Sequence, residues 1–363
     1  MNGAAVKVGM ECMATTRLER VLGGERIWPP PIWLMRQAGR YLPEYRAVRA
    51  QAGSFLDLCL DPERAAEVSL QPVERFGFDA AIVFADILLV AGALGQQLRF
   101  DEGQGPVLTP ALDGLGLDGL DRGRARDFLS PVGETVALVR ERLDPGVGLI
   151  GFCGGAWTVA TYMAAGGVSG DHMAARSWAY RDPDGFQELI DRIVDVSVGY
   201  LVGQLRAGAD AVKIFDSWAG VLPDGQFARW VIEPTRRMVE NVRAAVPGAK
   251  VIGFARGAGL RHLGYAMQAG LDALAIDEAV PLDFAAGTLQ PRLPIQGNLD
   301  PAALLAGGPR LEVAAREIAT ALGARPFVFN LGHGIHKDTP PEHVARLVDV
   351  VRGVADPIGR GSG

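Results

Sequence analysis

The chain has 363 residues, 48% of them hydrophobic, which is enough for two or three ordinary domains or for one α/β barrel with long loops. Its net charge of −6 argues against nucleic acid as the main partner. No apolar run reaches the roughly 18 residues of a membrane span, and residues 1–16 lack a signal-peptide core, so we expect a cytoplasmic protein. The spacing of Cys12, Cys59 and Cys153 is unlike that of zinc sites, so we expect no structural metal.

Short apolar runs of strand length alternate along the chain with longer stretches of helical periodicity. The runs cover residues 32–35, 80–84, 147–152, 211–215, 250–254, 273–276, 293–295 and 327–329. The helical stretches cover residues 62–75, 132–142, 183–206, 234–245, 260–268, 301–305, 311–321 and 341–352, and Asp-Pro pairs at 61–62, 182–183 and 300–301 mark helix starts. Alternation predicts parallel strands with right-handed crossovers, and eight units favour a closed (β/α)8 TIM barrel over an open sheet.

The alternation is interrupted between residues 98 and 130, where Gly, Pro and Asp are frequent. Residues 97–100 and 106–108 are expected to pair as a small hairpin inside an elaborated loop. We therefore expect one barrel domain over residues 17–354, with disordered ends at 1–16 and 355–363.

Polar or Gly-rich residues follow nearly every predicted strand. They are Arg36-Gln37, Asp86, Gly154-Gly155, Asp216-Ser217, Arg256, Asp277, Gln296-Gly297-Asn298 and residues 330–334. In a barrel these positions gather at the C-terminal mouth, where the active sites of this fold lie. The sequence thus predicts one active site there.

Two arginines, Arg36 and Arg40, flank a small turn that contains Gly39, directly after an apolar run. A guanidinium binds carboxylates through two parallel hydrogen bonds and keeps its charge at working pH. The pair therefore predicts a clamp for a ligand with several carboxylates. A structural salt bridge, for example to Glu44, is the alternative.

Residues 33–46 and 151–163 resemble the two signature motifs of the uroporphyrinogen decarboxylase family, and further matches lie at 79–88, 215–220, 296–301 and 330–335. The resemblance extends over about residues 17–354. It implies a single-domain TIM barrel, commonly a homodimer, that works without a cofactor in tetrapyrrole and haem biosynthesis. The implied reaction converts the four acetate side chains of uroporphyrinogen III to methyl groups, giving coproporphyrinogen III.

The resemblance also implies roles for individual residues. The residues implied in substrate binding are Arg36, Gln37, Ala38, Gly39, Arg40, Asp86, Tyr162, Ser217 and His333. Asp86 and Arg36 are the implied catalytic residues, with Asp86 facing the pyrrole N–H groups as a counter-charge. A guanidinium is a poor acid, so the proton donor stays open. His333 is expected to donate to a propionate or to titrate near neutrality.

Each of these positions also has a structural alternative. Asp86 could cap a helix, Tyr162 could pack in the core, Ser217 could cap a turn, and His333 could be structural. Arg256 has no role from the resemblance, and we expect it to bind a peripheral carboxylate.

The chain departs from the family pattern at two points: Ala156 replaces a usual proline, and Asp277-Glu278 stands where many members have Asp-Trp. We expect both changes to affect loop geometry more than activity.

Three other functions compete with decarboxylation. A corrinoid-dependent methyltransferase needs a His-x-Cys pair, which the sequence lacks. A non-catalytic tetrapyrrole carrier would need the arginine clamp but not Asp86. A phosphate-binding barrel needs a second anion loop after the seventh strand, where residues 296–298 lead straight into Leu299-Asp300-Pro301.

Overall fold

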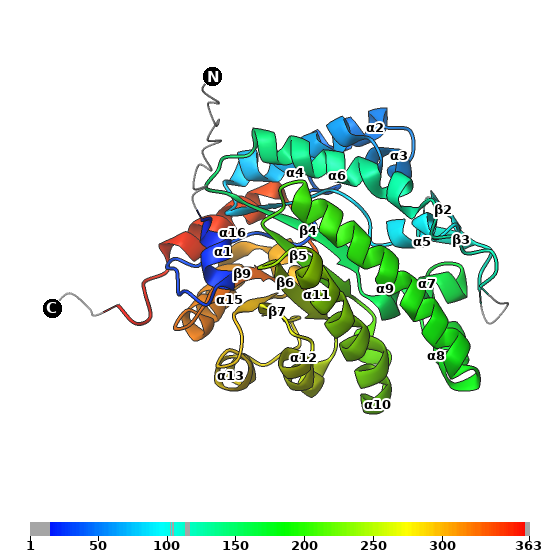
Figure 1. The fold of residues 1–363 in the computed structure, drawn as a ribbon. Coiled ribbons are helices and arrows are strands. Elements are labelled where there is room, and N and C mark those ends of the chain that lie inside the picture. Colours follow the sequence, from blue (N-terminus) through cyan, green and yellow to red (C-terminus); the bar gives the residue numbers. More distant parts are fainter. Residues whose placement is uncertain (1–14, 102, 104, 113–116, 360–363) are drawn as a thin grey trace, which may run out of the picture.

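Seven parallel strands form one curled sheet with helices on its outer side (Figure 1). The computed structural model describes residues 15–101, 103, 105–112 and 117–359. In sheet order the strands are β1 Ala80–Ile82, β4 Gly148–Gly154, β5 Ala211–Asp216, β6 Lys250–Ala255, β7 Ala273–Ala275, β8 Ile295–Leu299 and β9 Phe327–Leu331. Six of the eight predicted strands are therefore confirmed, and each pairs with its neighbour in the order of the sequence. The strand predicted at residues 293–295 is shifted, because β8 begins at Ile295 and includes residues 296–298, which were expected to follow it.

The first predicted strand, at residues 32–35, is reduced to a single bridge at Ile32. On one side, Phe329 N of β9 donates to Pro31 O (2.9 Å), and on the other side Asp79 N donates to Ile32 O (2.9 Å). The backbone pairing does not continue to Leu34 and Met35, because the amide groups of these two residues donate to side chains instead. Leu34 N donates to Gln37 Oε1 and Met35 N to Asn330 Oδ1.

The helices lie mainly between consecutive strands, as alternation predicts. They are α1 Arg17–Leu22, α2 Pro43–Gln51, α3 Phe55–Cys59, α4 Pro62–Phe76, α5 Leu89–Ala93, α6 Ala125–Arg142, α7 Ala156–Ala165, α8 Met173–Arg181, α9 Pro183–Arg206, α10 Asp224–Phe227, α11 Glu233–Ala245, α12 His262–Gln268, α13 Leu282–Phe284, α14 Pro301–Ala306, α15 Gly308–Leu322 and α16 Pro341–Gly353. Short 3-10 turns (η1 Ala219–Val221, η3 Gly259–Arg261) and π turns (η2 Ala228–Ile232, η4 Ala285–Leu289) join some of them. No helix in the described ranges is long and apolar enough to cross a membrane.

The predicted Asp-Pro helix starts are confirmed. The side chains of Asp61, Asp182 and Asp300 accept backbone N–H bonds at the starts of α4, α9 and α14. Each proline occupies the first turn, where its missing N–H costs nothing.

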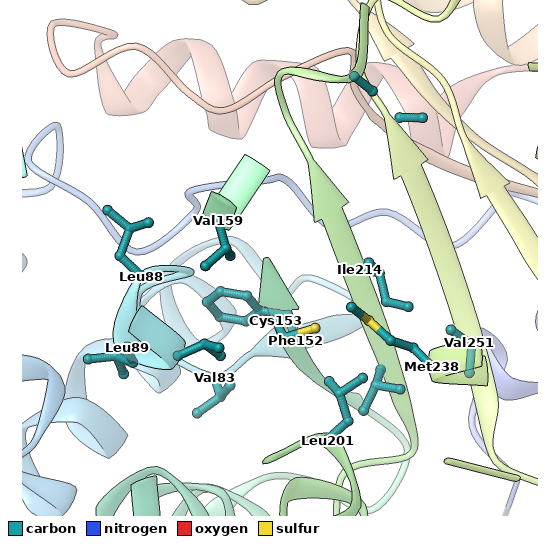
Figure 2. Packing of buried hydrophobic residues seen from close by; sticks show 14 of the residues in the cluster. Val83, Leu88, Leu89, Phe152, Cys153, Val159, Leu201, Ile214, Met238 and Val251 are labelled. Carbon is teal, nitrogen blue, oxygen red and sulfur yellow. The ribbon is translucent and has the colours of Figure 1, made fainter. Parts of the chain in front are cut away.

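The core has two parts, one on each face of the sheet. The larger lies between the sheet and the outer helices, and Figure 2 shows a portion where Ile214 and Val251 of the strands meet Leu201 and Met238 of α9 and α11. A smaller inner cluster lies inside the curl and includes Trp33, Met35 and Phe254. Leu18, Val21 and Leu22 of α1 belong to this inner cluster, so α1 covers one end of the curled sheet.

The predicted hairpin is confirmed as β2 Gln97–Asp101 and β3 Gly105–Thr109, which pair in antiparallel fashion. Leu108 N donates to Gly166 O at the end of α7, so the hairpin is bound to the main body (Figure 1). The ends expected to be disordered lie mostly outside the described residues. Within them, Thr16 caps α1, and Asp356 forms an ion pair with Arg26.

Candidate active site

Arg36 begins the candidate site, in a turn directly after the Ile32 bridge. Its φ of +60° is rare for a residue with a side chain, and such strained residues cluster at functional sites. The aliphatic part of Arg36 lies over Gly334, where an added Cβ would stand 2.3 Å from Arg36 Cδ. The loop after β9 therefore needs a residue without a side chain at 334 to let Arg36 lie across it.

Three of the predicted residues, Asp86, Tyr162 and His333, lie within electrostatic reach of a fourth, Arg36. Burial raises the pKa of Asp86 and Tyr162 and lowers that of His333, and the charge of Arg36 acts on all three in the lowering direction. These side chains come from the ends of the Ile32 segment, β1 and β9 and from helix α7. The structure thus brings together residues that are far apart in the sequence.

Asp86 follows β1 in a partly buried loop. Burial raises the pKa of its carboxyl group, whereas a hydrogen bond from Leu88 N to Oδ1 (2.8 Å) and the charge of Arg36 favour the ionised form. Asp86 lies ahead of Leu88, the N-cap of α5, so it does not occupy the N-cap position itself. Its second carboxylate oxygen stays available for a ligand.

His333 lies within electrostatic reach of the guanidinium groups of Arg36 and Arg256. Its ring stacks on Phe254 with centroids 6.2 Å apart, and its buried Nδ1 has no partner among the described residues. Burial, together with the charges of Arg36 and Arg256, lowers the pKa of His333 to about 3. The expectation that His333 titrates near neutrality is therefore wrong: the imidazole is neutral there because a proton would be buried beside the positive charges of two arginines.

Tyr162 and Ser217 lie on neighbouring elements. The Tyr162 ring contacts Trp218, with centroids 6.4 Å apart, and burial raises the pKa of the phenol. Ser217 follows β5 and is partly exposed, and within the described ranges its hydroxyl has no hydrogen bond. The hydroxyl that accepts from Trp218 N at 3.0 Å belongs to Thr158, so Ser217 does not cap that turn.

The structure does not bring the Gln37 side chain to this group. Gln37 is fully buried; its Nε2 donates to Ala80 O (3.1 Å) and its Oε1 accepts from Leu34 N (3.1 Å). Gln37 therefore ties the Ile32 segment to β1. Ala38 and Gly39 form the partly buried turn that follows.

Arg40 is exposed at the far side of that turn. Its charge lowers the pKa of Asp338, in the loop after β9, where Lys337 has the largest effect. The alternative salt bridge to Glu44 is not made, because Glu44 pairs with Arg75 at 3.1 Å. Arg40 thus lies at the rim of the group.

Lys213 of β5 was not predicted as a notable residue. It is fully buried on the inner face of the sheet, with Nζ 4.6 Å from the ring centroid of Phe215 and 5.1 Å from those of Trp33 and Phe254. Among the described residues its one polar contact is Met35 Sδ at 3.6 Å, and burial lowers the pKa of the amine well below its usual value. The signal in the sequence is a lysine inside an apolar strand.

Asp216, at the end of β5, holds the sheet to α7. Its Oδ1 accepts from Thr158 Oγ1 (2.5 Å) and Thr158 N (3.2 Å), and burial raises the pKa of the carboxyl to about 7. A Cβ at Gly155 would stand 2.5 Å from this carboxylate, so only glycine fits there. Ala156 forms the first turn of α7 in the position where proline was expected.

No group of three or more His, Cys, Asp or Glu side chains in the described ranges could hold a metal ion. Cys59 and Cys153 are buried free thiols, and Cys12 lies outside the described residues. The donor set that a zinc-dependent methyltransferase needs is therefore not found in this part of the chain.

Comparison with known proteins places the chain among tetrapyrrole enzymes. The family model described as "Uroporphyrinogen decarboxylase (URO-D)" matches residues 13–354. The uroporphyrinogen decarboxylase of Rhodospirillum rubrum is 50% identical over 92% of this chain and 96% of its own length, and that of Sinorhizobium fredii is 54% identical over 94% and 99%. A methyltransferase structure from Methanosarcina mazei shares the fold, with a TM-score of 0.74, 22% identity and coverage of 93% of this chain and 97% of its own.

Proposed function

The chain belongs to the uroporphyrinogen decarboxylase family, and we propose from this that it decarboxylates the four acetate side chains of uroporphyrinogen III to give coproporphyrinogen III. The observation that carries the proposal is the grouping of Arg36, Asp86, Tyr162 and His333 at one edge of the sheet. It combines a cation for carboxylates with a carboxylate for the reacting ring.

Loss of carbon dioxide leaves two electrons, which need an acceptor. A pyrrole protonated on the ring carbon next to the acetate-bearing carbon becomes an iminium-like cation, and this cation accepts the electrons. Carbon dioxide then leaves, and a second proton on the exocyclic carbon completes the methyl group while the ring proton is lost. The substrate thus supplies the electron sink.

Asp86 is the group suited to stabilise that cation. A carboxylate in partly buried surroundings lowers the energy of a developing positive charge more than water would. Burial raises the pKa of this carboxylate, and the Leu88 amide and Arg36 favour its ionised form in opposition to that effect. We assign Asp86 and Arg36 the catalytic roles, Asp86 as the counter-charge at the pyrrole N–H groups.

The other residues bind the substrate in this proposal. Arg36 and Arg40 bind carboxylate arms, with Gln37, Ala38 and Gly39 forming the turn between them. Tyr162, Ser217 and neutral His333 contact the substrate through groups that donate hydrogen bonds. The unpartnered Nδ1 of His333 and the unbonded hydroxyl of Ser217 support these roles.

We also infer that residues 31–33 act as an eighth strand. The backbone bonds of this segment to both β9 and Asp79 support closure of the sheet into a (β/α)8 barrel. Residues 17–354 would form this one domain. A homodimer in the cytoplasm, working without a cofactor, completes the proposal on the basis of the family resemblance.

The proposal is tested by incubating the purified protein with uroporphyrinogen III without oxygen and without added metal or cofactor. The products are then oxidised and separated by their number of carboxylates, and a series from eight to four is expected. A protein that binds the porphyrinogen but forms no such series would be a carrier.

Asp86→Asn keeps an acceptor for Leu88 N but removes the charge, so we expect kcat/KM to fall about 10²- to 10³-fold. In the unchanged protein, activity should also fall as the pH drops through the raised pKa of Asp86, because protonation removes the counter-charge. Both the variant rate and the pH profile are measured from initial rates. An Asp86→Asn protein of normal rate would exclude the counter-charge role.

A further inference from the structure

Arg256 and Glu278 form an ion pair at the same edge of the sheet as the proposed active site. Arg256 follows β6, Glu278 follows β7, and Arg256 Nη2 lies 3.4 Å from Glu278 Oε1. Both side chains are about one-third exposed, at 34% and 27%. The pair is therefore open to a ligand from solvent.

The backbone holds Arg256 firmly in place. Its N–H donates to Asp216 O (3.0 Å) and its carbonyl accepts from Gly220 N (2.9 Å), so it is bonded to the end of β5 and to the loop that follows. The next amide, Gly257 N, donates to Asp277 Oδ2 at 2.7 Å. The backbone at Arg256 is thus already ordered before a ligand binds, so binding does not have to pay for ordering it.

Arg256 belongs electrostatically to the active site. Its charge contributes, after burial and Arg36, to the lowered pKa of His333. Arg36 comes from the segment beside β9, whereas Arg256 comes from β6, and β7, β8 and β9 lie between the two along the curled sheet. His333 is thus influenced by two arginines that reach it from different parts of the sheet edge.

The interaction between Glu278 and Arg256 is weak. The contact is long and single, and the other oxygen, Oε2, is buried without a partner among the described residues. Glu278 is pressed against the β9 loop, where a Cβ on Gly332 would stand 2.2 Å from Glu278 N and 2.5 Å from Oε2. A guanidinium can make two parallel bonds to one carboxylate, so a ligand carboxylate can bind Arg256 better than Glu278 does.

We propose that Arg256 and Glu278 form a second carboxylate subsite. In this subsite the Glu278 carboxylate pairs with the Arg256 guanidinium until a propionate arm of the tetrapyrrole binds Arg256 and displaces Glu278. This proposal rests on the proposed function for the identity of its ligand. Arg256 is the binding residue, and Glu278 is a positioning residue that lowers its affinity. Because the propionates survive decarboxylation, an internal competitor weakens the hold on the product and favours its release.

The subsite is tested by binding of two oxidised, non-reacting porphyrins, uroporphyrin with eight carboxylates and coproporphyrin with four, followed by fluorescence. Glu278→Gln has the same shape without the charge, and it should tighten the binding of both porphyrins about two- to fivefold, the effect of one exposed ion pair. Arg256→Ala should weaken binding, and in that background Glu278→Gln should have no further effect. The control is Glu240→Gln, which removes a partner of Arg236 on α11 and should change nothing.

Turnover gives a second readout. Glu278→Gln should lower KM and increase inhibition by coproporphyrinogen, while Arg256→Ala should raise KM with little change in kcat. The subsite is excluded if Glu278→Gln fails to tighten binding, or if it tightens binding equally without Arg256. If the binding pattern holds but the unchanged protein forms no product, the subsite stands and the decarboxylase proposal fails.

Discussion

Lys213 is the residue whose surroundings differ most from what its side chain prefers. An amine buried among Trp33, Phe215 and Phe254 with only a thioether as polar contact has lost its hydration without gaining an acidic partner in the described ranges. Burial lowers the pKa of the amine, and loss of the proton reduces the free-energy cost of burying the group without hydration.

Lys213→Met should therefore stabilise the protein at neutral pH, by about 1–3 kcal/mol in the free energy of unfolding. Between the lowered pKa of the folded state and the ordinary value near 10.4, the unfolded chain binds a proton that the folded protein lacks, which costs stability. The gain from Lys213→Met should shrink as the pH rises towards 10. Urea unfolding at several pH values measures it.

Lys250→Met is the matched control. Lys250 lies on the next strand but pairs with Asp272 at 3.2 Å, so its removal should not stabilise the protein. A destabilised Lys213→Met protein would instead show that the amine makes interactions that a thioether cannot replace.

Single residues also show where prediction from the sequence works and where it stops. Asp86 and His333 could be predicted because strand ends are recognisable and parallel strands end at one edge. The burial of the Gln37 side chain could not be predicted, because its hydrogen-bond acceptor is the carbonyl of Ala80, 43 residues away in the sequence. The pairing of Arg256 with Glu278 likewise depends on the order of strands in space.

At the scale of elements, α4 positions the loop that carries Asp86. Ser69 of this helix accepts a hydrogen bond from Phe84 N at 2.8 Å and donates to Ala65 O at 2.6 Å. All three groups are buried, so water cannot replace the serine. The helix thereby fixes the path of the chain two residues before Asp86, the proposed catalytic carboxylate.

Ser69→Ala should lower the free energy of unfolding by about 1–3 kcal/mol, because the buried Phe84 N–H loses its acceptor. The control is Ser130→Ala on α6, because the Ser130 hydroxyl donates to Asp127 O in an exposed position. This variant should change the free energy of unfolding by less than about 0.5 kcal/mol. Urea unfolding of both variants gives the comparison. Equal midpoints would mean that another group takes over the Phe84 amide.

Helices with caps and apolar stripes were predictable, and α9 is found at the predicted residues 183–206. Helix α7 was not predicted, because nearly all of its residues are buried and no stripe exists for periodicity to detect. Helix α6 begins at Ala125, ahead of the predicted start at residue 132. The difference arises because Pro131 lies inside the helix, whereas a proline in a sequence usually indicates the first turn of a helix.

For the whole molecule, Asp79 is the residue that joins the Ile32 segment to the rest of the sheet. Its Oδ2 accepts from Ile32 N (2.9 Å), its own N–H donates to Ile32 O, and its Oδ1 lies 3.1 Å from Arg17 Nε. The predicted eight-strand pattern could not show that two side chains, those of Asp79 and Gln37, supplement a single backbone bond here, since ordinary strands pair through their backbones.

Asp79→Ala should lower the free energy of unfolding by about 1–3 kcal/mol and speed hydrogen exchange at the amide of Ile32. Asp79→Asn keeps an acceptor but loses the charge opposite Arg17, so it should retain most of the protection. Glu188→Ala, in an exposed pair with Arg192, is the control for loss of a surface carboxylate. Unchanged exchange in Asp79→Ala would show that β9 alone holds the segment.

The pairing of Ile32 with Phe329 also sets an order of events during synthesis of the chain. Ile32 can meet Asp79 early, but its other partner leaves the ribosome about 300 residues later, roughly 15–60 s at ordinary rates of translation. Until then the inner cluster stays open along one side, and the loop over which Arg36 lies does not yet exist. A nascent chain that stops before residue 327 therefore has most of the strands and no assembled site.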